Sequence, residues 1–231
     1  MVEPVSFEGF GAGAVAWFEG LERDNSKRYF DATRATFEDE VREPLELLLA
    51  ELGPEFHGEV HMFRQNRDVR FSPDKSPYKT ATYGVLRPPP GSAVALYAQI
   101  SSRGLYAGSG YWRMASDQLE KYREAVLDDG KGEALRGLLA GVVRSGLDLT
   151  EPSLKTAPRG MPRDHPRVEL LRYKDLVAGR RLHPGPALAT REALDFVAGT
   201  WRAVGPLNAW LDAHVGRSEL PREVRGGGQR R

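Results

Sequence analysis

The chain has 231 residues, with 33 Lys and Arg against 32 Asp and Glu, and it contains no cysteine. Its length suits one large domain or two small ones, and the lack of cysteine excludes disulfides and thiolate metal sites. No apolar run approaches the roughly 20 residues that cross a bilayer, and residues 1–8 lack the features of a secretion signal. A cytoplasmic location is therefore expected.

The net charge of +1 conceals a strong asymmetry along the chain. Residues 1–60 carry 5 Lys and Arg against 14 Asp and Glu, a net of −9, whereas residues 61–87 carry 6 against 2, a net of +4. A protein dedicated to duplex binding usually has a basic excess over its whole domain. The local excess therefore favours a small anion, or pairing between the two regions, over a long phosphate backbone.

The first 53 residues have the apolar spacing of amphipathic helices. Pro44 lies inside the longest of these stretches and is expected to kink it or to start a new helix. Gly53 and Pro54 are expected to end it.

Residues 60–112 have the composition of strands. Residues 60–71 are long enough for one strand or for two short ones that meet near Asn66. Residues 78–86 look extended. Alternation over residues 94–101, followed by a turn into residues 105–112, predicts an antiparallel hairpin.

The second half returns to helical spacing. Helices are expected after Ser116, over residues 135–143 and 167–173, and in two pieces over residues 194–211, with an extended stretch at 176–182. The sequence therefore predicts the α+β class, with a single domain over residues 1–215. A central, mostly antiparallel sheet is expected to be packed by amino- and carboxy-terminal helices. Residues 216–231 are predicted to be a flexible basic tail.

Residues 64–83 hold the densest run of fixed charges and turn-forming prolines in the chain. If residues 60–71 formed one flat strand, alternation would place Arg64, Asp68 and Arg70 on one polar face. Arginine and lysine donors that converge on one point bind phosphate or carboxylate groups. The candidate ligand-binding residues are Arg64, Arg67, Arg70, Lys75, Tyr78 and Lys79.

The same segment has an equally good structural interpretation. Asp68 and Asp74 can pair with neighbouring arginines and hold the loop to the sheet, because structural ion-pair networks resemble sites. The adjacent cations would repel a metal ion, and the five histidines lack metal-binding spacing, so neither a metal nor another cofactor is predicted. Asp68 and His165 are the weak candidates for proton transfer, and the catalytic residues stay unknown.

One long motif resembles a known family. Residues 67–80, together with residues 25–30, 108–112 and 158–166 in the same order and approximate spacing, are similar to a bacterial family catalogued as domain of unknown function 2461. The resemblance spans roughly residues 7–212. Where that family tends to have a paired Asn and a Trp-Phe, this chain has Asn25-Ser26 and Tyr29-Phe30. The resemblance implies one full-length domain and supplies no catalytic residue.

Three functions remain open from the sequence. The first is binding of a small anionic ligand, a phosphate- or carboxylate-bearing molecule, with or without a reaction. The second is a nucleic-acid-binding module that uses the basic segment with Tyr78 and Tyr83. The third is a structural or interaction protein in which the segment is an ion-pair lock, and the last helices offer Trp201, Trp210 and Leu211 to a partner. No membrane partner is expected, and the oligomeric state is left open.

Overall fold

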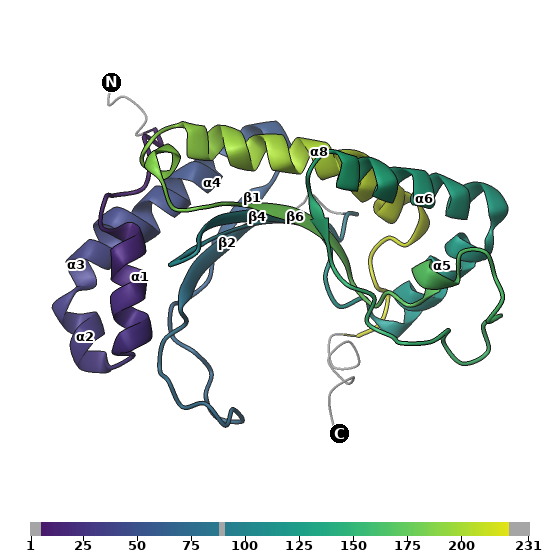
Figure 1. The fold of residues 1–231 in the computed structure, drawn as a ribbon, viewed down its shortest axis with the longest axis horizontal. Coiled ribbons are helices and arrows are strands. Elements are labelled where there is room, and N and C mark those ends of the chain that lie inside the picture. The colour runs from purple at the N-terminus through teal and green to yellow at the C-terminus, as the bar shows by residue number, and fades with distance from the viewer. Residues whose placement is uncertain (1–5, 88–90, 222–231) are drawn as a thin grey trace. The chain divides into compact units, whose positions relative to one another are not determined.

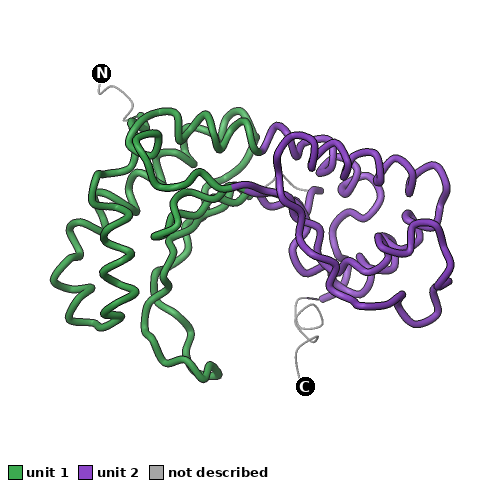
Figure 2. The backbone as a smooth tube through the Cα atoms, in the orientation of Figure 1, with its two compact units in different colours: residues 1–87, 96–107, 181–200 green, residues 88–95, 108–180, 201–231 purple. Residues whose placement is uncertain are grey.

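The computed structural model describes residues 6–87 and 91–221 and divides the chain into two compact units (Figure 2). Unit 1 consists of residues 1–87, 96–107 and 181–200, and unit 2 of residues 88–95, 108–180 and 201–231. Both units contribute strands to one six-stranded sheet of order β1-β2-β3-β4-β6-β5. Helices pack on this sheet, so the predicted α+β class is confirmed.

Figure 1 labels most of these elements along the chain. The strands are β1 (Glu59–Met62), β2 (Ala81–Arg87), β3 (Ala95–Ser101), β4 (Gly104–Tyr111), β5 (Asp148–Leu149) and β6 (Leu176–Leu182). The helices are α1 (Ala14–Arg23), α2 (Lys27–Ala32), α3 (Arg34–Phe37), α4 (Glu43–Phe56), α5 (Ser116–Leu127), α6 (Asp129–Arg144), α7 (Val168–Leu171) and α8 (Glu192–His214). The pairs β1–β2, β2–β3 and β5–β6 are antiparallel. None of the described helices is long and apolar enough to cross a membrane.

Prolines act differently at three helix positions. A π-helical turn at Glu38–Arg42 precedes α4, and Pro44 lies in the first turn of that helix, so the predicted new start is confirmed. The predicted end at Gly53 and Pro54 is wrong, because α4 continues for one more turn. It ends where His57 adopts a left-handed φ of 50°. The expected break in the last helix is also wrong, since α8 runs through Pro206.

The core of unit 1 lies between α4 and one face of β1 and β2. Leu45, Leu48 and Leu49 of α4 are fully buried. A Cβ atom on Gly84 of β2 would lie 2.5 Å from Leu49 Cδ1, which shows how closely the helix approaches the strand. The opposite face of these strands is therefore the one that can meet a ligand.

The first helices are joined through a tyrosine hydroxyl. Tyr29 donates to the backbone oxygen of Trp17 at 2.9 Å, and Trp17 Nε1 donates to Thr33 Oγ1 at 2.9 Å. A Cβ atom on Gly20 would lie 2.0 Å from the Tyr29 oxygen, so glycine makes room for it.

The core of unit 2 contains the aromatic side chains that the third function offered to a partner. Trp201, Trp210 and Leu211 of α8 are 1%, 7% and 0% exposed, respectively. Trp210 Nε1 also donates to the Lys131 backbone oxygen at 3.1 Å. The prediction of a partner face at these residues is therefore wrong, because they pack inside their own unit.

The first residues of the predicted basic tail contact α5. Gln118 Nε2 donates to the Gly216 oxygen at 2.7 Å, and Lys121 pairs with Glu219 at 2.7 Å. The rest of the predicted tail, residues 222–231, lies outside the described residues.

A polar clamp holds the first described residues of unit 1 to α4 and to Arg191, the residue before α8. Glu51 accepts a hydrogen bond from the Phe7 amide at 3.0 Å, and Arg191 Nη1 donates to the Phe7 oxygen at 2.7 Å. Arg191 also pairs with Glu51. The Arg191 hydrogen bond lowers the pKa of Glu51 below its ordinary value.

Because the folded pKa of Glu51 is lowered, its contribution to stability should depend on pH. The contribution should be complete above the ordinary pKa near 4.5 and should disappear as the pH falls through the lowered folded value. We expect Glu51→Gln to lower the free energy of unfolding by about 1 kcal/mol at pH 7, a discounted value for a partly exposed pair. Urea denaturation from pH 7 to pH 3 measures this difference. An undiminished gap at pH 3 would show that packing, rather than charge, carries the effect.

Candidate functional site

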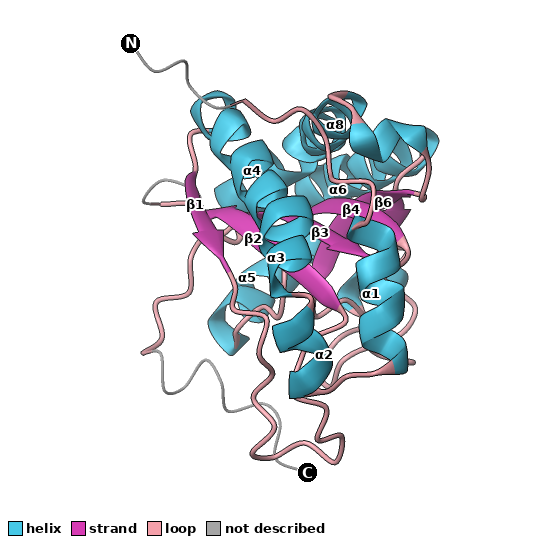
Figure 3. Ribbon diagram, turned by 90° about the vertical axis from the view of Figure 1, so that its left-hand side faces the viewer, coloured by secondary structure: helices cyan, strands magenta, loops and turns pink. Residues whose placement is uncertain are grey.

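The charged segment forms a projecting hairpin, residues 63–80, which we call the arm. The Arg67 amide donates to the Pro77 oxygen at 2.8 Å, and the Lys79 amide to the Gln65 oxygen at 3.0 Å. Figures 1 and 3 both show the arm extending beyond the ends of β1 and β2. Of the two alternatives for residues 60–71, one flat strand is excluded, since β1 stops at Met62. The chain turns at Arg70 and Phe71 and bends at Pro73 and Pro77, so the polar face that depended on a flat strand does not form.

The base of the arm is fixed to the first helices. Asn25 accepts from the Tyr78 amide at 3.0 Å and donates to the Tyr78 oxygen at 3.1 Å, as a neighbouring strand would. The Tyr78 ring stacks on Phe30 with centroids 4.3 Å apart and is only 6% exposed. Tyr78, a predicted ligand residue, is thus a packing residue that anchors the arm.

Ion pairs within the arm neutralise most of its tip. Asp68 accepts from Arg70 Nε at 2.9 Å and from Arg70 Nη2 at 2.7 Å, which lowers the Asp68 pKa to about 2. Asp74 pairs with Arg67, and this contact holds the Asp74 pKa well below its ordinary value. Lys75 Nζ donates to the Val69 oxygen at 2.9 Å. The structure therefore brings the predicted cations together, but each arginine of the tip faces a carboxylate.

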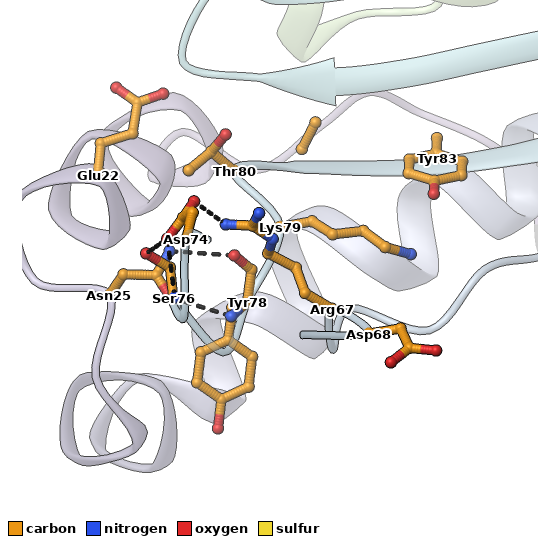
Figure 4. Close-up of a pocket in the computed structure, with 11 residues that line it drawn as sticks. Glu22, Asn25, Arg67, Asp68, Asp74, Ser76, Tyr78, Lys79, Thr80 and Tyr83 are labelled. Carbon is orange, nitrogen blue, oxygen red and sulfur yellow. Dashed lines mark hydrogen bonds and ion pairs between the residues drawn. The ribbon is translucent and has the colours of Figure 1, made fainter. Parts of the chain in front are cut away.

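An open hollow of about 600 Å³ lies between the arm and the first helices (Figure 4). Its charged lining consists of three carboxylates (Glu22, Asp68 and Asp74) and two cations (Arg67 and Lys79). Asn25, Ser76, Thr80 and Tyr83 add polar groups and a ring. The hollow thus has no excess of positive charge with which to hold an anion.

The two proton-transfer candidates belong to different units. Asp68 lies in the arm of unit 1, whereas His165 lies in unit 2, where its Nδ1 accepts from the Arg167 amide at 3.2 Å. Within residues 6–87 and 91–221 no group of three or more His, Asp or Glu side chains could hold a metal ion.

A row of aromatic rings crosses the sheet of unit 1 on the face away from α4. Phe63, Tyr83, Tyr97 and Tyr106 follow one another with centroids 4.8, 5.5 and 6.2 Å apart. The register supports this arrangement, since Val85 pairs with Tyr97 and leaves Tyr83 and Tyr97 on the same face. Phe63 is 37% exposed and the three tyrosines are half-buried. We call these four side chains the aromatic row.

A cation lies over each end of the aromatic row. Lys79 Nζ is 4.5 Å from the Tyr83 centroid and also donates to the Arg64 oxygen at 2.6 Å. At the other end, Arg181 Cζ is 5.4 Å from the Tyr106 centroid. Such contacts orient a cation against a ring without neutralising its charge.

Arg181 differs from Arg67 and Arg70 of the arm tip because it has no carboxylate partner among the described residues. Its Nη1 atom is buried without a hydrogen bond. Burial, and next the neighbouring charge of Arg103, lower the Arg181 pKa. Next to both arginines the backbone of β4 lies close to that of β6, since a Cβ atom on Gly104, at a φ of 90°, would lie 2.2 Å from the Leu182 oxygen. We call this place the Arg103–Arg181 corner.

The sequence alone predicts only part of the aromatic row and of the Arg103–Arg181 corner. Alternation over residues 94–101 correctly separates Tyr97 from Ala98. Nothing local indicates that Arg181, in a strand 75 positions after Tyr106, would lie over that ring. The contact depends on strand order, which the local pattern does not specify.

Comparison with known proteins gives one match. The model of a family described as "Conserved hypothetical protein (DUF2461)" matches residues 13–210. This range includes the arm, the aromatic row and the Arg103–Arg181 corner. No curated protein matches the chain significantly.

Proposed function

The chain belongs to the DUF2461 family, whose description assigns no activity, and we propose that it binds a phosphate or carboxylate group at the Arg103–Arg181 corner. The observation that carries this proposal is the buried Nη1 of Arg181, which has no partner among the described residues. A buried guanidinium nitrogen without an acceptor is costly, and a rotation of the Arg181 side chain that exposes Nη1 would let an anion at the corner accept its hydrogen bond. The proposal concerns binding and names no reaction.

The electrostatic surroundings favour the Arg103–Arg181 corner, rather than the arm, as the anion site. The arginines of the arm tip, Arg67 and Arg70, pair with Asp74 and Asp68. The groups that affect the Arg181 pKa are a second arginine and two tyrosines, with no carboxylate among them. Two like charges held close together are stabilised by an anion that bridges them.

We expect inorganic phosphate and acetate, titrated separately into the protein, to shift the backbone amide resonances of residues around Arg181. Arg181→Gln should weaken the binding of the anion with the higher affinity by about tenfold, since a charged hydrogen bond contributes about 1.5–3 kcal/mol. Arg136→Gln removes an equal charge from an exposed pair on α6 and should leave the affinity unchanged. A melting curve of each variant checks its folding.

The same titration tests the arm directly. If Arg70→Gln weakens binding and Arg181→Gln does not, the anion binds in the arm and the placement proposed here is wrong. The absence of a saturable shift with either anion would remove the function itself.

A further inference from the structure

The aromatic row and the cations around it share one face of unit 1. Arg181 contacts Tyr106 at one end and Lys79 contacts Tyr83 at the other, with Tyr97 between them. The proposed anion site is thus one end of a longer surface, and its ligand can extend across the strands.

We propose that this surface binds single-stranded nucleic acid, with bases on the aromatic row and phosphates at Arg181 and Lys79. The inference rests on the proposed anion site, which supplies one of the phosphate contacts. Tyrosine and phenylalanine rings on a sheet offer stacking surfaces to unpaired bases, and stacking tolerates any sequence. The phosphates of the strand then need cations beside the rings rather than in a separate patch.

The charge on this face complements a polyanion. The cations of the strands and turns that carry the row are Arg64, Lys79, Arg87, Arg103 and Arg181, and the register places the carboxylate of Glu59 opposite Arg87. Arg64 is exposed, and its backbone oxygen holds Lys79 Nζ at 2.6 Å. Of the carboxylates beside Lys79 and Tyr83, Asp68 and Asp74 are paired with Arg70 and Arg67, whereas Glu22 offsets one of these cations. The positive excess of this face is therefore reduced by Glu22 but not cancelled.

The chemistry of the rings favours a stacking partner over a purely apolar one. Phe63, Tyr83 and Tyr106 keep an accessible surface, while burial, and next the neighbouring tyrosines, raise the Tyr97 pKa above its ordinary value. The Tyr97 hydroxyl in the middle of the row thus adds no negative charge to repel phosphates. An acidic peptide would satisfy the cations but would leave the rings without a stacking partner.

Fluorescence anisotropy with a labelled single-stranded oligonucleotide of mixed sequence, about ten nucleotides long to match small binding folds, tests the inference. We expect binding that weakens with salt. Tyr83→Leu and Tyr106→Leu, which keep apolar bulk, should each weaken it between fivefold and a hundredfold. Lys79→Gln should lower the salt slope by about 0.7, the value for one phosphate contact on a single strand. Phe71→Leu, at an almost fully exposed ring of the arm tip (94%), is the matched control and should change the affinity less than twofold.

Four results of the binding measurements would overturn the inference, and a fifth would come from light scattering. The first three are no binding at low salt, a duplex that binds as tightly as the single strand, and an affinity that neither tyrosine substitution changes. The fourth is a glutamate polymer of matched charge that competes as well as an unlabelled oligonucleotide. A dimer in light scattering that Tyr83→Leu dissociates would assign the row to a second copy instead, which also overturns it.

The inference and the proposed function can fail separately. If phosphate binds at Arg181 but the oligonucleotide does not bind, the small-anion function stands alone. If the oligonucleotide binds through the row but Arg181→Gln leaves phosphate binding unchanged, the anion site is wrong and the stacking surface remains.

Discussion

Gly110→Ala is expected to destabilise unit 2 by about 3 kcal/mol or more, from a strained backbone together with overpacking. Gly110 has a φ of 140°, which side chains other than glycine rarely adopt. A Cβ atom there would lie 2.2 Å from the Leu176 oxygen of β6. The colliding atom belongs to the backbone of a paired strand, so no side-chain rotation can relieve the contact.

Urea denaturation followed by far-ultraviolet circular dichroism measures the effect of Gly110→Ala. The matched control is Gly137→Ala on α6, where a Cβ atom meets nothing within 4 Å. That substitution should raise stability by up to about 1 kcal/mol, because alanine favours a helix over glycine. A Gly110→Ala protein within about 1 kcal/mol of wild type would mean that β4 and β6 can separate at this point.

The second large effect is expected at Arg167, a buried guanidinium that closes the end of α5. Arg167 is 4% exposed and donates to the oxygens of Val126 and Leu127 at 2.9 and 3.1 Å. It also pairs with Asp129 at 2.9 Å. Arg167→Met should cost about 3 kcal/mol, because it leaves the last carbonyls of the helix buried without donors.

Two controls separate helix capping from simple loss of charge. Asp129→Asn removes only the exposed partner, whose side chain is 98% accessible, and should change stability by less than about 1 kcal/mol. Arg136→Met removes an exposed arginine of α6 and should have a similarly small effect. If Asp129→Asn cost as much as Arg167→Met, the ion pair rather than the capping of α5 would be the important contact.

The helices were largely predictable because their evidence is local. The three- and four-residue spacing from Phe30 to Leu52 survives in α2, α3 and α4. The end of α4 was predicted too early. Pro54 removes only one hydrogen bond of the helix, and the buried Leu52 still packs against the core, so the helix continues past the proline. The hairpin β3–β4 was predicted because its alternation and its turn agree.

The arm and the corner could not be derived in the same way. The cations of residues 64–79 are visible in the sequence, but their pairing depends on how the chain turns at Arg70 and Phe71 and bends at Pro73 and Pro77. β1 ends at Met62, and the chain returns to contact Asn25 through Tyr78, which lies 53 positions later in the sequence. Arg181 lies over Tyr106 only after the strand order is set. Charge density in the sequence therefore located the arm, whereas the Arg103–Arg181 corner could be found only in the tertiary structure.

The contact between Asn25 and Tyr78 has a consequence for how the arm meets a ligand. To swing at its base, the arm would have to break both hydrogen bonds to Asn25 and separate the Tyr78 and Phe30 rings. The neighbouring Lys79 is thus held beside Tyr83 before any ligand arrives. A ligand at that end of the sheet would meet a preorganised surface, so that little of its binding free energy would be lost as conformational entropy.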